Sequence, residues 1–161
     1  MIDSTIILPV TLQKPWLIGH LWVRRMRNGI ILEERDEGEG LVTTAGVNLL
    51  VADWTNANAT LKLSNFHDSG TGTLAAAITD TVLQIPTGSS RGVGTQSNSG
   101  NQYQSVGNIN YSNTFTITEW GLFTASVAGT LWDHKVFSPG YPVHNGDVLQ
   151  FVYQLQAIAG G

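Results

Sequence analysis

The sequence predicts a mostly β protein, an antiparallel β-sandwich or jelly roll with one short helix near residues 43–55. Segments with a period of two in β-branched and aromatic residues recur along the chain, which is typical of half-buried strands. Turn residues separate these segments roughly every ten residues, a spacing common in all-β domains. Strands do not alternate with long helical segments, and this argues against a βαβ architecture.

Length and composition limit the domain organisation and the partners. The 161 residues suffice for one domain, so we expect a single β-rich domain over 17–158, an extended N-terminal arm over 1–16 and a tail over 159–161. Only 12% of the residues are charged, a low share that suits structural β proteins and surfaces covered by partners. The net charge of -4 argues against a nucleic-acid partner, and the apolar runs are too short to span a membrane. With no cysteine, disulfides and thiol nucleophiles are excluded.

The N-terminal arm contains one short apolar run, Ile6-Ile7-Leu8. Pro9 follows this run directly, and Pro15 lies near the end of the arm. Prolines this close to a short run favour an extended arm or an edge strand over a helix. Two interpretations stay open: the arm reaches a neighbouring subunit, or it folds back on its own domain.

Residues 17–36 predict a β-hairpin, because Asn28-Gly29 is the preferred pair for a type I′ turn. That turn would pair Arg27 with Ile30, Arg25 with Leu32, and Arg24 with Glu33. Residues 42–54 follow as the predicted helix, capped by Thr43 or Thr44. Its expected apolar face consists of Val47, Leu50, Val51 and Trp54.

The middle of the chain is less regular. Residues 60–66 alternate and predict a strand, residues 67–73 predict a loop, and the alanines of 74–83 favour one or two helical turns. Residues 87–113 are rich in Gly, Ser, Asn and Gln, and we interpret them as two sparsely apolar strands joined by a turn at Ser97–Asn101.

The strand predicted at 114–123 is the centre of the expected fold. It first alternates and then becomes apolar on both faces at Trp120-Gly121-Leu122-Phe123, as in a strand covered on both sides. We expect its core side chains to pack against those of the last strand. The core side chains of the 114–123 strand are Phe115, Ile117, Leu122 and Phe123, and those of the last strand are Leu149, Phe151, Tyr153 and Leu155. Glu119 should be paired with backbone or a nearby donor, since a lone buried carboxylate is costly. Between the strand at 114–123 and the last strand, the sequence predicts a strand at 130–137, a connection through Pro139 and Pro142, and a turn at 144–147.

No set of residues predicts catalysis, a metal or a cofactor. His67-Asp68-Ser69 has the residue types of a serine triad, but triad members normally come from separate parts of the chain. The four histidines lack the spacing of a metal site. Five tryptophans either form core and interface anchors or suggest a sugar-binding face. We therefore expect a protein that is not an enzyme.

Five segments together resemble virion structural proteins of tailed bacteriophages, and the resemblance covers roughly residues 40–158. The segments are residues 42–53, Phe66-His67-Asp68-Ser69-Gly70-Thr71-Gly72-Thr73, residues 117–123, residues 129–137 and residues 146–155. In size and layout the chain is most similar to head decoration, or cement, proteins. That resemblance implies a β-rich protein on the outer capsid surface that bridges neighbouring capsid subunits.

The partners implied are the major capsid protein and further copies of this chain, as a dimer or trimer. Interface residues expected on this basis are Ile6, Ile7, Leu8, Trp16, Trp22 and Trp132. A phage tail or fibre component and a carbohydrate-binding adhesin module are the alternatives.

Overall fold

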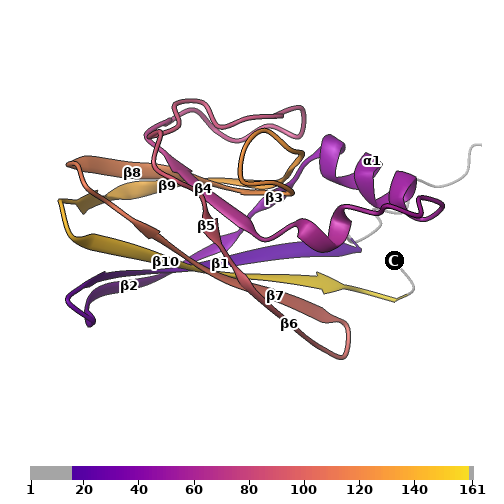
Figure 1. Ribbon diagram of the computed structural model, residues 1–161, viewed down its shortest axis with the longest axis horizontal. Helices are drawn as coiled ribbons and strands as arrows, with labels where there is room; N and C mark the ends of the chain where they lie inside the picture. The colour runs from indigo at the N-terminus through magenta and orange to yellow at the C-terminus, as the bar shows by residue number, and fades with distance from the viewer. Residues whose placement is uncertain (1–15, 160–161) are drawn as a thin grey trace, which may run out of the picture.

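The computed structural model describes residues 16–159, which form two antiparallel sheets of five strands packed face to face (Figure 1). In spatial order the first sheet contains β2 (Ile30–Glu39), β1 (Leu17–Arg27), β10 (Asp147–Ala157), β7 (Gln102–Asn110) and β6 (Thr95–Ser99). The second contains β3 (Leu41–Val42), β9 (Leu131–Val143), β8 (Phe115–Phe123), β4 (Phe66–Gly70) and β5 (Gly92–Val93). This confirms the predicted antiparallel β-sandwich.

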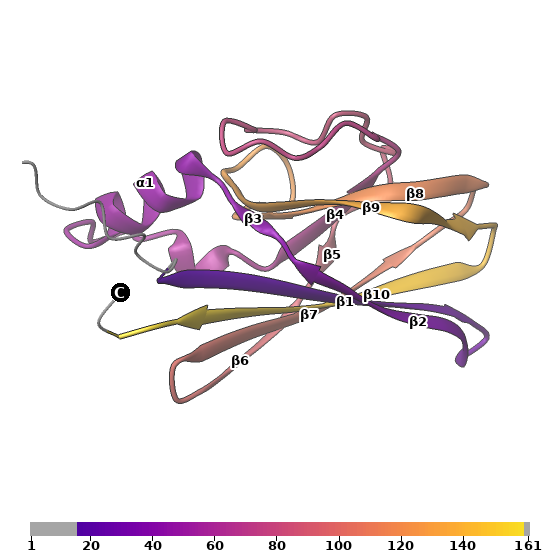
Figure 2. The same cartoon turned by 180° about the vertical axis from the view of Figure 1, so that it is seen from behind.

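One α-helix and one 3-10 turn lie together at one end of the sandwich, while the tip of the β1–β2 hairpin lies at the other (Figures 1 and 2). The helix α1 spans Thr44–Asp53, and the 3-10 turn η1 spans Leu61–Leu63. Thr43 caps α1 as expected, since its Oγ1 accepts the Gly46 N–H at 3.0 Å. No helix in residues 16–159 is long and apolar enough to cross a membrane.

The core lies between the sheets, and β8 and β10 supply its largest side chains. Trp120 of β8 packs against Tyr153 and Phe151 of β10, with ring centroids 5.3 and 6.3 Å apart. Leu149 and Leu122 are fully buried in the same cluster. The predicted packing of β8 on β10 is therefore confirmed for these positions.

Phe123 is an exception, because it points to the opposite face of β8. There it forms a second cluster with Leu83 and Leu131, and Arg91 lies 3.5 Å above its ring. Arg91 also pairs with Asp68 at 2.8 Å. The two apolar faces of β8 thus serve two separate clusters, one between the sheets and one on the outer side of the second sheet.

The β1–β2 hairpin has the predicted turn and the predicted Arg27–Ile30 pairing, but its register differs from the prediction beyond Met26. Asn28 and Gly29 both adopt positive φ, as a type I′ turn requires. Beyond the turn a bulge adds Leu32 to β2, so Arg25 pairs with Glu33 and Arg24 with Glu34 instead of Glu33. The resulting Arg24–Glu34 ion pair at 2.8 Å is exposed and contributes only a few tenths of a kcal/mol.

The strand predicted at 60–66 is wrong, and the loop predicted at 67–73 contains a strand. The Asp53 carboxylate accepts the N–H groups of Thr60 and Leu61 at 2.6 Å, and this holds the chain in the turn that becomes η1. β4 begins only at Phe66 and runs beside β8. Because β4 is covered on both faces, its residues His67–Gly70 are buried despite their polarity.

The helical turns predicted at 74–83 are absent, since this segment is irregular in the structure. The connection predicted at Pro139 and Pro142 is also wrong, because β9 continues through both prolines to Val143. β3 pairs only with Asp133 and His134, so the second half of β9 is an edge strand. Proline is tolerated there because its missing N–H faces no neighbouring strand.

Candidate interaction surface

Residues 71–86 cross the outer face of the second sheet as a loop, which we call the clamped loop. In the sequence it connects β4 to the segment before β5, and in Figure 1 it lies along the upper edge above β8 and β9. A loop of this length would ordinarily be mobile unless something held it. What holds this one is a buried carboxylate on the sheet beneath it.

The carboxylate belongs to Glu119 of β8, whose side chain is fully buried. Its Oε1 accepts the N–H groups of Gly72 at 3.0 Å and Ile85 at 2.7 Å, one near each end of the loop. Its Oε2 accepts the Gln84 N–H at 2.9 Å. Three backbone donors on one carboxylate fix both ends of the clamped loop to the same point of the sheet.

A buried histidine extends this network to the middle of the loop. His134 of β9 contacts Glu119 Oε2 through Nε2 at 3.1 Å and Asp80 Oδ2 through Nδ1 at 2.7 Å. Burial lowers the pKa of His134, but the two carboxylates outweigh it and the pKa is raised. Burial conversely raises the pKa of Glu119, while His134 and the backbone donors outweigh it and the pKa is lowered. Between these two pKa values the pair is ionised and attractive.

A β-bulge in β8 explains why the Glu119 side chain points to the outer face of the second sheet. A bulge interrupts the β8–β9 pairing between Ile117 and Glu119. It directs Ile117 and Trp120 to the core between the sheets, whereas Thr118 and Glu119 both contact Gly72 on the outer side. The expectation that Glu119 is satisfied by backbone and a nearby donor is confirmed.

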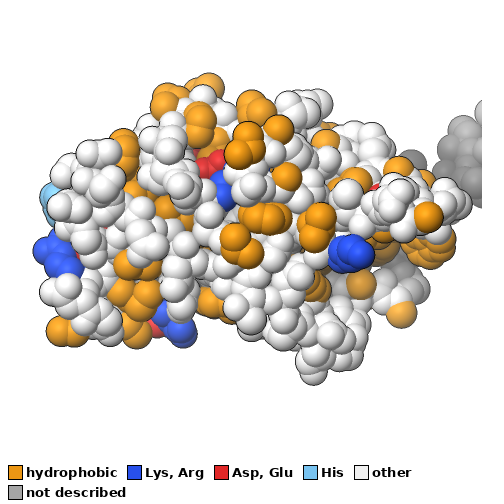
Figure 3. Space-filling view, viewed as in Figure 1, with side chains coloured by type: hydrophobic (Ala, Val, Ile, Leu, Met, Phe, Trp, Pro, Cys, Tyr) orange, Lys and Arg blue, Asp and Glu red, His pale blue; other side chains and the backbone are white. Residues whose placement is uncertain are grey.

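The clamped loop presents apolar side chains to solvent. Leu83 alone turns inward, to the cluster with Phe123. The other four large aliphatic residues are more than half exposed: Leu74 at 74%, Ile78 at 55%, Val82 at 66% and Ile85 at 58%. Figure 3 shows hydrophobic side chains in orange over the part of the surface where the loop lies. Exposed apolar side chains gathered on a fixed backbone are typical of a protein-binding surface.

The residues expected at interfaces do not lie together. Ile6, Ile7 and Leu8 fall outside the described residues. Trp16 is 47% exposed, and its carbonyl accepts the Ile158 N–H, which extends the β1–β10 pairing. It therefore belongs to the sandwich rather than to an arm.

Trp132 is only 2% exposed and lies in the core, where its indole N–H donates to the Tyr153 hydroxyl at 3.1 Å. Trp132 is therefore a core residue that only borders the surface at the α1 end of the sandwich, and its role at an interface stays a prediction. The alternation of β9 directs it between the sheets, where an aromatic side chain is most stabilising.

Trp22 lies on the outer face of the first sheet, stacked on His20 with ring centroids 4.1 Å apart. Amide side chains cover the strands beside it: Gln154 donates to Gln104 at 3.0 Å, and Gln150 donates to Asn108 at 3.2 Å. A depression of about 270 Å³ is lined by Trp22 together with Gln154. Arg24, Glu34 and Val152 complete the lining of this depression, so the face is mainly polar and differs in character from the clamped loop.

The three triad residue types of β4 do not form a catalytic site. His67 is fully buried; its Nδ1 accepts the Trp120 indole N–H at 3.1 Å, so its own proton lies on Nε2, 2.8 Å from Ser105 Oγ. A ring nitrogen that donates to a serine cannot remove that serine's proton. Burial lowers the pKa of His67 to about 3, which keeps the ring neutral. Asp68 pairs with Arg91 on the other face of the strand.

Within residues 16–159, no group of three or more histidine and carboxylate side chains is arranged to hold a metal ion. The molecule is defined by its fold as a two-sheet antiparallel β-sandwich with a clamped apolar loop. Comparisons with family models, curated proteins and solved structures found no match to this chain.

Proposed function

We propose that this protein is a structural component of a tailed-bacteriophage virion, a head decoration protein that binds the outside of the capsid and bridges neighbouring capsid subunits. The clamped loop supports the proposal most directly. Its four exposed aliphatic side chains are held on a backbone that three hydrogen bonds to Glu119 fix in place. A surface fixed before binding loses little conformational entropy on docking.

The resemblance to virion proteins provides the second support. Its segments include parts of β4, β8, β9 and β10. These strands contribute to the core, and β8 and β9 carry Glu119 and His134, which hold the clamped loop in place. A decoration protein needs a stable core and weak repeated contacts rather than a reaction centre, because many copies on a closed shell act together.

A charge on the clamped loop should remove the protein from the particle. In phage particles assembled with Leu74→Asp or Ile78→Asp chains, we expect at least a tenfold lower number of copies per particle than with the unaltered chain. The reason is that each carboxylate would be buried against the capsid without a partner. Quantitative mass spectrometry of purified particles measures the copy number.

Ile30→Asp is the matched control, because Ile30 is 66% exposed but lies at the hairpin tip. It should leave the copy number unchanged. Cryo-electron microscopy of the same particles places the chain. Density for it on the tail instead of the head would support a tail or fibre component and overturn head decoration, as would unchanged occupancy of both loop variants.

A carbohydrate-binding adhesin is the second candidate function, and the Trp22 face favours it. An aromatic ring bordered by amide side chains suits neutral sugars, since the ring stacks on the sugar's C–H groups while amides bond its hydroxyls. On a glycan array this candidate predicts binding that Trp22→Ala reduces at least tenfold while Trp54→Ala, at an 80% exposed position at the C-terminal end of α1, does not. An array without any binding would eliminate it.

A further inference from the structure

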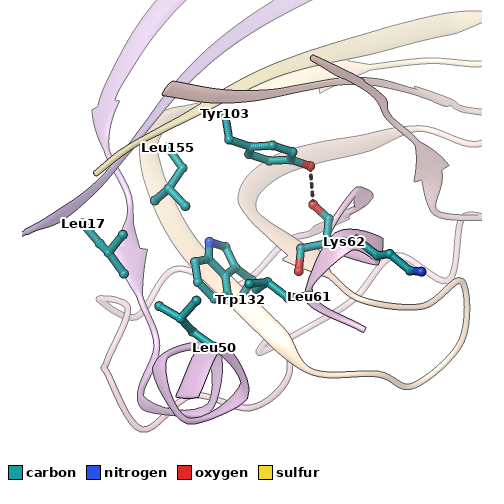
Figure 4. Close-up of a pocket in the computed structure, with 8 residues that line it drawn as sticks. Leu17, Leu50, Leu61, Lys62, Tyr103, Trp132 and Leu155 are labelled. Atoms are coloured by element: carbon teal, nitrogen blue, oxygen red, sulfur yellow. Dashed lines mark hydrogen bonds between the residues drawn. The ribbon is translucent and has the colours of Figure 1, made fainter. Parts of the chain in front are cut away.

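An apolar groove of about 340 Å³ opens at the end of the sandwich that carries α1 (Figure 4). Its lining comes from both sheets, α1 and η1, and consists mainly of Leu17, Leu50, Leu61, Tyr103, Trp132 and Leu155. The one charged residue at its border, Lys62, points its ammonium group away from the leucine side chains. The Tyr103 hydroxyl is already engaged, because it donates to the Ser64 carbonyl at 2.8 Å.

The groove is therefore suited to aliphatic side chains. A cavity of roughly 150 Å³ already accommodates a benzene ring, and this groove is larger. Apolar surface of this kind favours an apolar occupant, since removal of both surfaces from water is favourable. The same end of the molecule carries further exposed apolar side chains, on Trp16, Val51, Trp54 and Leu63.

The sequence contains one aliphatic segment outside the described residues, Ile6-Ile7-Leu8. The described chain begins at Trp16, next to Leu17 of the groove lining. The ten residue steps from Ile6 to Trp16 span at most roughly 36 Å when extended. The aliphatic segment is thus joined by a short stretch of chain to a residue that lines an apolar groove.

The two prolines between the segment and the sandwich favour a groove on another molecule. The β1–β10 pairing continues to Trp16, whose carbonyl accepts the Ile158 N–H. An extended connection from there to Leu8 would carry the segment away from the groove beside Leu17, so a chain that fills its own groove would need a reversal between Leu8 and Trp16. Pro9 and Pro15 oppose a compact reversal, because each fixes its own φ and restricts the residue before it to extended backbone.

We propose that Ile6-Ile7-Leu8 of one copy docks in the apolar groove of a second copy, so that the chain forms a homo-oligomer by exchange of N-terminal segments. A reciprocal exchange closes a dimer, and a head-to-tail exchange closes a ring such as a trimer. This exchange does not depend on what the clamped loop binds, so failure of the capsid proposal would leave it standing.

Sedimentation of the purified full-length chain tests the exchange. The unaltered chain is expected at two or three times its monomer mass of 17.4 kDa. Ile7→Asp, which alters the segment, and Leu50→Asp, which alters the groove, should each reduce the mass to that of the monomer. Ile78→Asp is the matched control on the clamped loop and should leave the oligomer intact. Thermal unfolding shows whether Leu50→Asp is folded, and Ile7→Asp tests the exchange without a change in the sandwich.

Mixing the two defective chains distinguishes exchange from docking within one molecule. The Leu50→Asp chain keeps an intact segment, and the Ile7→Asp chain keeps an intact groove. An equimolar mixture should therefore form a two-chain complex held by one contact, with the segment of the Leu50→Asp chain in the groove of the Ile7→Asp chain, and it should not form a closed ring. A monomeric unaltered chain, an Ile7→Asp chain that stays oligomeric, or a mixture that stays monomeric would each overturn the proposal.

Discussion

Glu119→Ala is expected to lower the free energy of unfolding by about 4 kcal/mol. The substitution leaves three backbone N–H groups of the clamped loop and the buried His134 without their acceptor. Removal of one partner from a buried charged network typically costs about 3–5 kcal/mol, because the remaining groups stay desolvated and unpaired. Urea denaturation followed by circular dichroism measures the loss.

The same substitution should release the clamped loop, so limited proteolysis is expected to cut within residues 71–86 before the sandwich unfolds. Glu34→Ala is the matched control, since Glu34 forms only the exposed ion pair with Arg24. Its cost should stay below about 1 kcal/mol. If Glu119→Ala lowered the free energy of unfolding no more than this control and the loop stayed resistant to proteolysis, the Glu119 carboxylate would have no role in holding the loop.

Asp133→Asn is expected to stabilise the protein increasingly as the pH rises from about 4 to about 7, by up to on the order of 4 kcal/mol, and to keep that effect at higher pH. Asp133 is fully buried between Gly19 and Gly40, and it accepts a hydrogen bond from the Tyr153 hydroxyl at 2.9 Å. Burial raises its pKa from 3.8 to about 7. Asparagine keeps the acceptor for Tyr153 but cannot ionise.

The direction of this pH dependence follows from the difference in proton binding between the folded and the unfolded chain. With a folded-state pKa above the unfolded one, Asp133 favours the folded state most below pH 3.8, and that contribution is lost as the pH rises to about 7. Melting temperatures of both chains across this range measure the difference, which should grow with pH.

Asp147→Asn provides a control of opposite sign. The pairing of Asp147 with Arg27, at 2.6 and 3.0 Å, lowers the pKa of Asp147, so its contribution is present at neutral pH and is lost on acidification. Asp147→Asn should therefore destabilise most at neutral pH. A melting-temperature difference for Asp133→Asn that did not change with pH would show that Asp133 is not titrating in this range.

The candidate interaction surface was the part least accessible from the sequence. Leu74, Ile78 and Val82 are spaced four residues apart, as on one face of a helix, yet they lie on an irregular loop. The sequence indicates that the Glu119 carboxylate needs a partner, but its backbone donors lie 34 to 47 residues earlier in the chain. No local pattern identifies an acceptor and donors that far apart, and no other signal in the sequence distinguishes these exposed aliphatic residues from core.

Burial was the second quantity that the sequence left open. Trp22 and Trp132 are equally plausible as interface anchors from residue type, but one lies on an outer face and the other in the core. The predicted apolar face of α1 shows the same difficulty, since Val51 and Trp54 are 63% and 80% exposed. The helix lies at the end of the sandwich, where only Gly46 of its residues is buried against Trp132.

The sequence by itself determined the features that depend on neighbouring residues. The Asn28-Gly29 turn, the Thr43 cap, and the alternation of β8 and β10 all follow from local backbone preferences and side-chain period, and together they specify an antiparallel sandwich. Only the tertiary structure decided the bulges in β2 and β8, the strand at Phe66–Gly70 and the path of the clamped loop. Each of these is fixed by hydrogen bonds and packing between residues far apart in the chain, which local preference cannot specify.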